Sequence, residues 1–453
     1  MIKAFKGTFF HTPNYGKLDI LEDAIILVNE EGVIEDIINQ DDPTYNTVLN
    51  DFPKENIFEL KDGQYFLPGF IDTHIHAPQW PQAGVALDEP LDVWLQEKTF
   101  PLEAKFKDVA YVKDVYTDLV HTLLANGTTT ALYFATVHKE SSYELAKICA
   151  ELGQRGLVGK VVADNVEETP DYYRDASTEE ALLDTEDFIL KVKNLANDVK
   201  QGVYPVVTPR FVPSCTPEAL KGLGELASKY NVHVQSHVSE GDWQHHYAKN
   251  RFDRRDSEVL RDAGLFGKKS VMAHGTYLNE DDADILVDTH TGVAHCPISN
   301  VYFGDAVMKA QMLKNKGVDV GLGTDLSAGY SPSLYANARQ AVMSQRQVEH
   351  GVDAEIPLSD RYTENVRISM VEAFYFATTG GGEALDLPIG MFKRGYAFDG
   401  QVIDTTNPYN EIKAFEKETD LGGIFERMMY RVTPHNIVDV FVQGELVHSK
   451  GGK

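Results

Sequence analysis

Side chains that can bind metal or carry protons recur in this sequence where predicted strands end. The residues at these positions are His74, His76, Arg210, His237, Glu240, His274, His295 and Asp325. A single histidine at a strand end more often has a structural role than a catalytic one. Here five of the chain's 15 histidines share such positions with two carboxylates and an arginine. Because the C-terminal ends of barrel strands meet at one face, the pattern indicates a common site.

The His74-Ile75-His76 segment is the first candidate for metal binding. Alternate residues of a strand face the same way, so both imidazoles point to one side. With His237 and Asp325 they form a set of three nitrogens and one carboxylate. Such a set suits Zn²⁺ or Fe²⁺ and leaves a position for water.

The number of metal ions depends on whether a bridging ligand is present. A site with two metals would need one from the middle strands, such as a carbamylated lysine. The predicted strand at 203–211 contains no lysine, so we expect one metal. Lys160, in the strand before it, is the alternative bridge, although a role as an interior or edge charge is more ordinary.

Short apolar runs alternate with amphipathic stretches between residues 69 and 379, which is typical of repeated βα units. The predicted strands are 66–74, 128–135, 157–164, 203–211, 232–237, 270–274, 292–295 and 318–325. The predicted helices are 111–125, 141–152, 179–196, 217–230, 280–287, 307–316 and 334–349. Eight such units predict an α/β protein with a closed (β/α)8 barrel of the TIM type.

Both ends of the chain depart from this alternation. Strand-like runs with turns occur at 24–28, 33–38, 401–404 and 438–442. We expect residues 1–67 and 387–448 to form one small composite β-sandwich domain, with the barrel at 68–386 inserted between them. Two unrelated β extensions are the alternative.

The composition excludes several classes of protein. The 453 residues include 69 acidic and 42 basic side chains, and the formal net charge is -27. This charge disfavours nucleic-acid polymers and anionic membranes as partners. Cys149, Cys215 and Cys296 are too few for a disulfide framework. Since the N-terminal region also has no long apolar core, we expect a cytoplasmic protein.

Several blocks of sequence resemble the amidohydrolase superfamily of metal-dependent hydrolases. They are residues 68–76, 235–237, 272–275, 294–300 and 321–325. Further blocks at 76–79, 100–106, 133–136, 208–211 and 329–331 resemble the branch of this superfamily that deaminates guanine. The resemblance runs from the first predicted strand to the end of the barrel, and more weakly into both termini.

The resemblance implies hydrolysis of guanine at C2 to xanthine and ammonia. One zinc ion would be held by His74, His76, His237 and Asp325, with Fe²⁺ as the alternative. Asp325 would take a proton from the metal-activated water, and His274 would lie beside that water. Glu240, three residues after His237, would protonate the ring nitrogen of the base. A homodimer is also implied.

The base itself is expected to contact Gln79, Arg210, Phe211 and His237. Arg210 has only donors and suits O6 or N7, whereas the amide of Gln79 can both give and accept hydrogen bonds. Phe211 could stack on the ring. The structural alternatives are an ion pair of Arg210 with an acidic loop, a core position for Phe211 and a loop role for Gln79. His295 and Asn300 are as consistent with loop stabilisation as with substrate contact.

Two other functions are alternatives to guanine deamination. A related amidohydrolase could deaminate another amino-substituted purine, a pterin or a triazine, and only the pocket residues separate these substrates. A scaffold that has lost its chemistry should lack metal ligands, yet all the expected ligands and Glu240 are present. The pattern therefore favours an enzyme.

Overall fold

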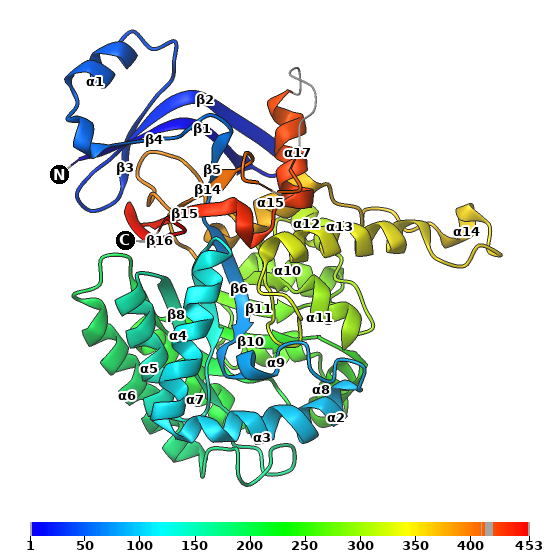
Figure 1. Cartoon of the computed structure of the whole chain (residues 1–453). Helices are drawn as coiled ribbons and strands as arrows, with labels where there is room; N and C mark the ends of the chain where they lie inside the picture. The colour runs from blue at the N-terminus through cyan, green and yellow to red at the C-terminus, as the bar shows by residue number, and fades with distance from the viewer. Residues whose placement is uncertain (1, 409, 413–419, 452–453) are drawn as a thin grey trace.

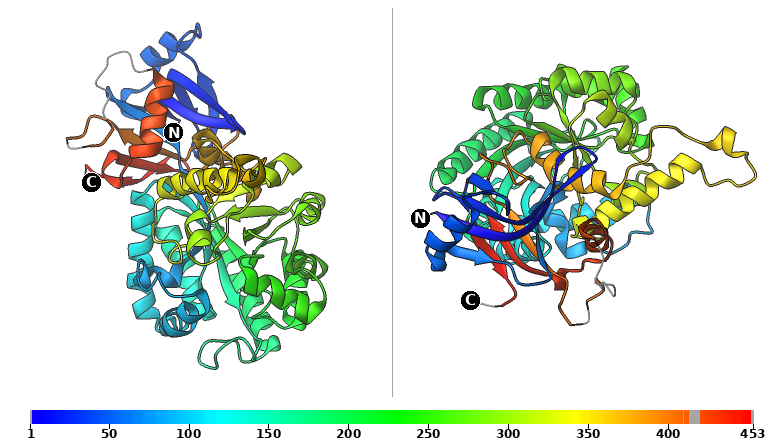
Figure 2. Two further views of the ribbon diagram at one scale, coloured as in Figure 1. Left: turned by 90° about the vertical axis from the view of Figure 1, so that its right-hand side faces the viewer. Right: turned by 90° about the horizontal axis from the view of Figure 1, so that it is seen from above.

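The structure, a computed structural model, describes residues 2–408, 410–412 and 420–451. Its larger part is a closed barrel of parallel strands surrounded by helices, and a separate sheet lies against one end (Figures 1 and 2). Within the described residues, no helix combines the length and apolar character needed to cross a bilayer.

Eight strands close the barrel, as the sequence predicted. They are β6 (Phe70–His76), β7 (Thr128–Phe134), β8 (Arg155–Val162), β9 (Val203–Pro209), β10 (His233–Val238), β11 (Ser270–His274), β12 (Gly292–His295) and β13 (Val320–Leu322). The prediction was wrong in two details. The predicted strand at 66–74 is divided at Gly69, where a Cβ atom would lie 2.2 Å from Thr129. The last strand ends at Leu322, because the backbone then turns and Asp325 adopts a φ of 47°.

The helices around the barrel include all seven that were predicted. These are α4 (Val109–Ala125), α5 (Lys139–Leu152), α6 (Thr178–Ala196), α7 (Pro217–Tyr230), α10 (Glu280–Thr289), α12 (Ala310–Lys316) and α13 (Leu334–His350). Further helices are α8 (Asp242–Phe252), α9 (Asp256–Asp262), α11 (Pro297–Tyr302), α14 (Leu358–Arg361), α15 (Met370–Ala377) and α16 (Thr379–Ala384). The loop after β6 contains η2 (Ala77–Gln82), α2 (Leu91–Trp94), η3 (Leu95–Thr99), α3 (Phe100–Glu103) and η4 (Ala104–Lys107).

Helix α7 shows how local sequence fixes these elements. The side chain of Thr216 caps its first turn by accepting a hydrogen bond from the backbone of Ala219, and Pro217 occupies the first helical position. Asn231 ends the helix in the left-handed conformation. The residues buried against the barrel recur at helical spacing: Ala219, Leu220, Leu223, Gly224 and Ala227.

Both ends of the chain contribute to the second sheet. Its strands are β1 (Lys3–Asn14), β2 (Lys17–Val28), β3 (Ile34–Ile38), β4 (Ile57–Glu59), β5 (Gln64–Pro68), β14 (Gly400–Asp404), β15 (Ile437–Val442) and β16 (Glu445–Ser449). The two halves join where β5 pairs with β14. Helices α1 (Tyr45–Asp51) and α17 (Leu421–Arg431) accompany this sheet, and both termini lie beside it (Figure 1).

The strands form one continuous sheet, whereas the predicted β-sandwich would consist of two sheets packed face to face. The distance of 5.2 Å between the ring centroids of Phe5 in β1 and Phe441 in β15 shows that the sheet curls. In a flat sheet, strands separated by three spacings would lie about 14 Å apart. The sandwich-like character therefore comes from one sheet folded around an aromatic core, which also contains Phe66 and Phe398.

We propose that the small domain comprises residues 1–67 and 387–448 and that the barrel domain comprises 68–386. Residues 409 and 413–419, within the second stretch, lie outside the described residues. A buried ion pair joins the two parts: Arg155 in β8 contacts Asp399, with only 3% and 1% of their side chains exposed.

Candidate active site

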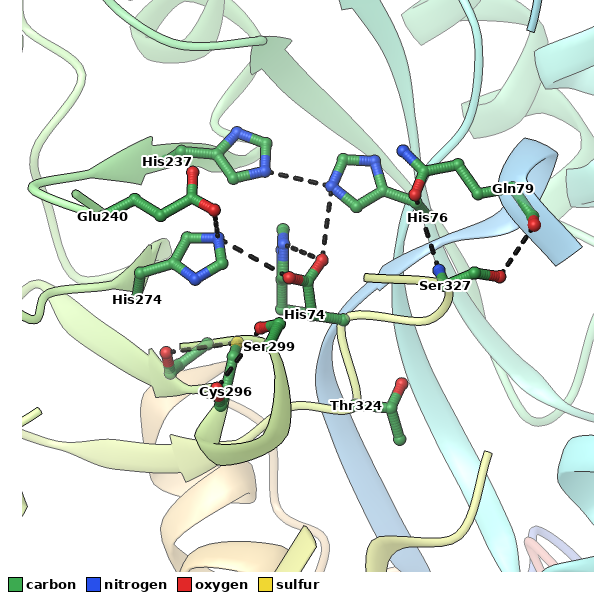
Figure 3. Close-up of polar contacts among 12 residues, drawn as sticks. His74, His76, Gln79, His237, Glu240, His274, Cys296, Ser299, Thr324 and Ser327 are labelled. Carbon is green, nitrogen blue, oxygen red and sulfur yellow. Dashed lines mark hydrogen bonds and ion pairs between the residues drawn. The ribbon is translucent and has the colours of Figure 1, made fainter. Parts of the chain in front are cut away.

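Four of the five histidines and both carboxylates predicted at the strand ends converge at one mouth of the barrel (Figure 3), and His295 is the exception. His76 Nε2 lies 3.0 Å from His237 Nε2. Asp325 Oδ1 lies 3.1 Å from His74 Nε2 and 3.5 Å from His76 Nε2. All four side chains are buried. Residues more than 250 positions apart therefore meet as the sequence predicted.

Hydrogen bonds made by the outer ring nitrogens orient two of these histidines. His237 Nδ1 is 2.5 Å from the carbonyl oxygen of Arg210, and His274 Nδ1 is 2.9 Å from Asn300 Oδ1. Both partners are oxygen acceptors, so each Nδ1 carries a proton and each ring presents its Nε2 to the cluster. Such bonds are the usual means by which proteins orient histidines that bind metal.

The backbone that carries Asp325 is held against β6. The Asp325 N–H donates to the carbonyl oxygen of His74 over 2.8 Å. Beside it, the carboxylate of Asp72 accepts from the backbone of Thr324 over 3.0 Å and from that of His74 over 3.2 Å. Burial raises the pKa of Asp72 to about 7. Asp72 was not predicted as part of the site, and it links the first and last barrel strands.

Electrostatics keep the inner groups in the states that bind a cation. Burial lowers the pKa of His74, and it lowers those of His76 and His237 well below the usual value, so the three rings are neutral. Burial opposes ionisation of Asp325, but the hydrogen-bonding imidazole of His74 and the adjoining ring of His274 outweigh it and lower the pKa of this carboxyl to about 2. The result is three neutral nitrogen donors beside a carboxylate.

This donor set fits a divalent metal ion. Among the described residues, His74 Nε2 is buried and makes no hydrogen bond, so its lone pair has no protein partner. Ligand atoms bound tetrahedrally at about 2.0–2.1 Å lie about 3.3 Å apart, close to the separations found here. Neutral imidazoles and a carboxylate are also the ligand types that zinc and iron use.

Glu240 lies at the outer side of the donor cluster. Its Oε1 is 3.6 Å from His274 Nε2, and its side chain is 14% exposed. Burial raises the pKa of this carboxyl. The loop that carries it is fixed because the Ser239 side chain donates to Asp256 over 2.7 Å and Thr276 donates to the carbonyl oxygen of Glu240 over 2.6 Å. A carboxyl with these properties can donate a proton into the cavity.

A cavity of about 890 Å³ opens over the cluster, and the residues predicted to bind the base lie on its wall. Gln79, Arg210, Phe211 and Glu240 line it together with His76, His237, His274 and Asp325. Phe211 is half-buried at the rim, 5.7 Å from the ring of Trp243. A flat ring can therefore lie between the donor cluster and this aromatic rim.

Arg210 and Gln79 share a partner that the sequence did not reveal. Arg210 Nη1 is 2.9 Å from Glu103 Oε2, and Gln79 Nε2 donates to Glu103 Oε1 over 2.9 Å. Arg210 thus forms the ion pair that was considered as an alternative to binding the base, and it lines the cavity as well. Glu103 lies in residues 100–106, one of the blocks that resemble other amidohydrolases, but no role for it was predicted from the sequence.

Asn300 and His295 differ in their relation to the site. Asn300 acts through His274, as described above. His295 is buried, does not line the cavity, and has its pKa lowered by burial to about 3. It is therefore a neutral group behind the site.

Lys160 is engaged elsewhere. Its ammonium forms an ion pair with Asp175, and the two side chains are 0% and 5% exposed. Asp175 also accepts from the backbone of Ala163 over 2.9 Å. Lys160 is therefore an interior charge with a structural partner, the more ordinary of the two roles that the sequence allowed.

Replacing Lys160 with methionine should reduce stability without removing metal. Breaking a buried ion pair leaves Asp175 uncompensated, which costs about 3–5 kcal/mol of the free energy of unfolding. Urea unfolding and metal analysis of the same sample test this. The double variant Lys160→Met/Asp175→Asn should recover part of the loss. A folded Lys160→Met protein that had lost its metal would instead make Lys160 part of the metal site.

Comparisons with known proteins agree with this geometry. Residues 65–447 match the amidohydrolase family. The chain belongs to the amidohydrolase family. It is 33% identical over 460 residues to guanine deaminase from Dictyostelium discoideum, covering 99% of this chain and 98% of that protein. It is 34% identical over 454 residues to guanine deaminase from Homo sapiens, covering 98% and 96%.

The likeness extends to the three-dimensional structure. A crystal structure of guanine deaminase from C. acetobutylicum, with guanine bound in the active site, superposes with a TM-score of 0.87 at 33% identity. The match covers 99% of this chain and 100% of that one. It therefore includes the sheet built from both termini as well as the barrel.

Proposed function

We propose that this chain is a metal-dependent aminohydrolase that converts guanine and water to xanthine and ammonia. The observation that carries the proposal is the likeness to guanine deaminases along the entire chain. The site supports it independently, because a cluster of metal-binding groups adjoins a cavity with Arg210 and Gln79 on its wall.

His74, His76, His237 and Asp325 would hold one metal ion. We propose zinc, with Fe²⁺ as the alternative that this ligand set also accepts. When bound, such an ion supplies Lewis acidity that lowers the pKa of a water molecule toward about 7. Among these donor groups, His237 is oriented by the hydrogen bond of its Nδ1 to the carbonyl oxygen of Arg210.

The protein's own groups would move the protons. Asp325 is ionised and can accept a proton from the attacking water. His274 has its free Nε2 on the same side and can bind that water. Glu240 would protonate the ring nitrogen as the water oxygen attacks C2, and then help deliver a proton to the departing ammonia.

The cavity wall would select and orient the base. Arg210 offers donors to O6 or N7, Gln79 offers its amide to the same edge, and Phe211 would cover a ring face. His237 would contribute to the pocket floor. These contacts favour guanine over amino-substituted purines and triazines without a ring carbonyl, because both polar groups of the wall can donate to such a carbonyl. A pterin also has a ring carbonyl, so the substrate panel has to separate it from guanine.

One experiment tests the substrate directly. Ammonia release should be measured over a panel of purines, pterins and aminotriazines, with metal analysis of the same sample. We expect guanine to be the preferred substrate. Faster turnover of a pterin or triazine would replace the proposed substrate with the alternative.

Replacing His237 with alanine should remove most of the metal. The wild-type protein should contain about one transition metal per chain, and loss of one of four ligands lowers affinity strongly. His233→Ala is a matched control, since His233 lies on the same strand but binds the carbonyl oxygen of Leu385 over 2.8 Å. Two tightly bound metals in the wild type, or full retention in His237→Ala, would contradict the ligand assignment.

A homodimer in the cytoplasm completes the proposal. Three free cysteines support a reducing compartment. Light scattering on the purified protein tests the dimer, and fractionation of the source cells tests the location.

A further inference from the structure

Glu103 connects the two polar groups of the proposed base pocket. It is the last residue of α3, and its side chain is fully buried. Oε2 is 2.9 Å from Arg210 Nη1, Oε1 is 3.5 Å from Arg210 Nη2, and Oε1 accepts from Gln79 Nε2 over 2.9 Å. One carboxylate therefore fixes a guanidinium and an amide that come from different strand ends.

The carboxylate of Glu103 determines the orientation of the side-chain amide of Gln79. A carboxylate oxygen can only accept a hydrogen bond, so the NH₂ group must point to Glu103. The carbonyl oxygen Oε1 is then directed to the backbone N–H of Ser327, 3.4 Å away. If the amide were flipped, its carbonyl oxygen would face Glu103 Oε1, and two acceptors would lie against each other. The second N–H of Gln79 Nε2 is therefore the part of this amide that remains available to a ligand.

Arg210 is restrained in a similar way. Its guanidinium lies over the ring of Phe100, with 5.1 Å between its central carbon and the ring centroid, and Glu103 occupies one side. Burial, and then the neighbouring charge of Glu103, raise the pKa of Tyr173, so the phenol beside this pair stays protonated. The remaining N–H groups of Arg210 can serve only an acceptor.

We propose that Glu103 is the positioning residue that makes this pocket select a 6-oxo purine over a 6-amino purine. The inference rests on the proposed function and deepens it. Gln79 alone could serve either group, because a rotated amide would present an acceptor to an exocyclic amine. With Glu103 in place, Gln79 and Arg210 both present donors. A ring carbonyl satisfies them, whereas an amine leaves them unpaired.

The test compares guanine with 2,6-diaminopurine, which keeps the 2-amino group and has an amine in place of O6. In Glu103→Gln the new amide can accept or donate, so Gln79 is free to rotate. We expect kcat/KM for guanine to fall roughly 10²-fold and that for diaminopurine to fall much less. Their ratio should drop at least roughly tenfold, while metal content stays at the wild-type value.

Two further variants separate positioning from general damage. Asp399→Asn removes the carboxylate from the buried Arg155 pair at the junction of the two domains. It should lower the melting temperature without changing the ratio of the two substrates. Glu103→Asp keeps the negative charge but has a shorter side chain. Its ratio of kcat/KM for guanine to that for diaminopurine should therefore lie between the ratios of the wild type and Glu103→Gln. If Glu103→Gln does not fold, Glu103→Asp is the variant that tests the proposal.

The possible outcomes are distinct. An equal loss for both bases in a folded Glu103 variant would overturn the inference, because a merely structural role lowers both. If the wild type releases no ammonia from guanine, the proposed function itself fails. A wild type that prefers guanine, combined with a ratio that depends on Glu103, supports both.

Discussion

Replacing Glu240 with glutamine should lower guanine turnover roughly 10²- to 10⁴-fold while leaving fold and metal content intact. Glutamine has nearly the same shape but cannot exchange a proton at this position. Glu240 is not among the four proposed metal ligands, and its Oε1 lies 3.6 Å from His274 Nε2. The loss should therefore appear in kcat.

The environment of Glu240 supports this role. Burial raises the pKa of its carboxyl, so the protonated form persists to higher pH than in an exposed glutamate. Such a group can donate a proton to a base bound in the adjoining cavity.

Ammonia release, metal analysis and circular dichroism on one preparation check the prediction. Glu225→Gln makes the same chemical change on α7, where the side chain is 71% exposed, and should leave turnover unaltered. Near-normal turnover in Glu240→Gln would mean that another group transfers the proton. Loss of metal would mean that Glu240 helps to bind it.

The barrel was predictable because its physical requirements are local. Strands buried on both faces give short apolar runs, and the chain continues into an amphipathic helix after most of them. The polar residues at the ends of several of these runs, His76, His237 and His274 among them, then line the shared mouth. His237 and Asp325 could be placed together from these patterns without any knowledge of the contacts between strands.

The contacts that escaped prediction depend on distant pairings. Glu103 lies in a loop of short helical turns that has no clear periodicity, and its partner Arg210 is 107 residues away. The curl of the second sheet depends on the pairing of β5 with β14, whose residues Gln64 and Asp404 are 340 positions apart. No local pattern specifies such pairings, although the alternation of apolar residues did reveal the strands themselves.

Discrimination between guanine and adenine should be large and should depend on Arg210. Guanine presents O6 and N7 as acceptors, whereas adenine places a donating amine where O6 would be. Because Glu103 holds Arg210 and Gln79 as donors, adenine in the same pose would leave buried donors unpaired. A site built on hydrogen bonds can reach roughly 10⁴-fold discrimination or more by this means.

Arg210→Met and Gln79→Ala should therefore cut guanine turnover severely and leave the metal in place. Each variant removes a donor from the cavity wall without touching a proposed ligand side chain. Gln82→Ala is a control from the same short helix, since Gln82 donates to Thr99 over 2.9 Å and does not line the cavity. Steady-state kinetics with guanine and adenine, together with metal analysis, provide the measurement. Comparable wild-type rates on the two bases, or unchanged guanine turnover in both variants, would mean that other residues form the pocket. The donors held by Glu103 would then have no part in choosing the substrate.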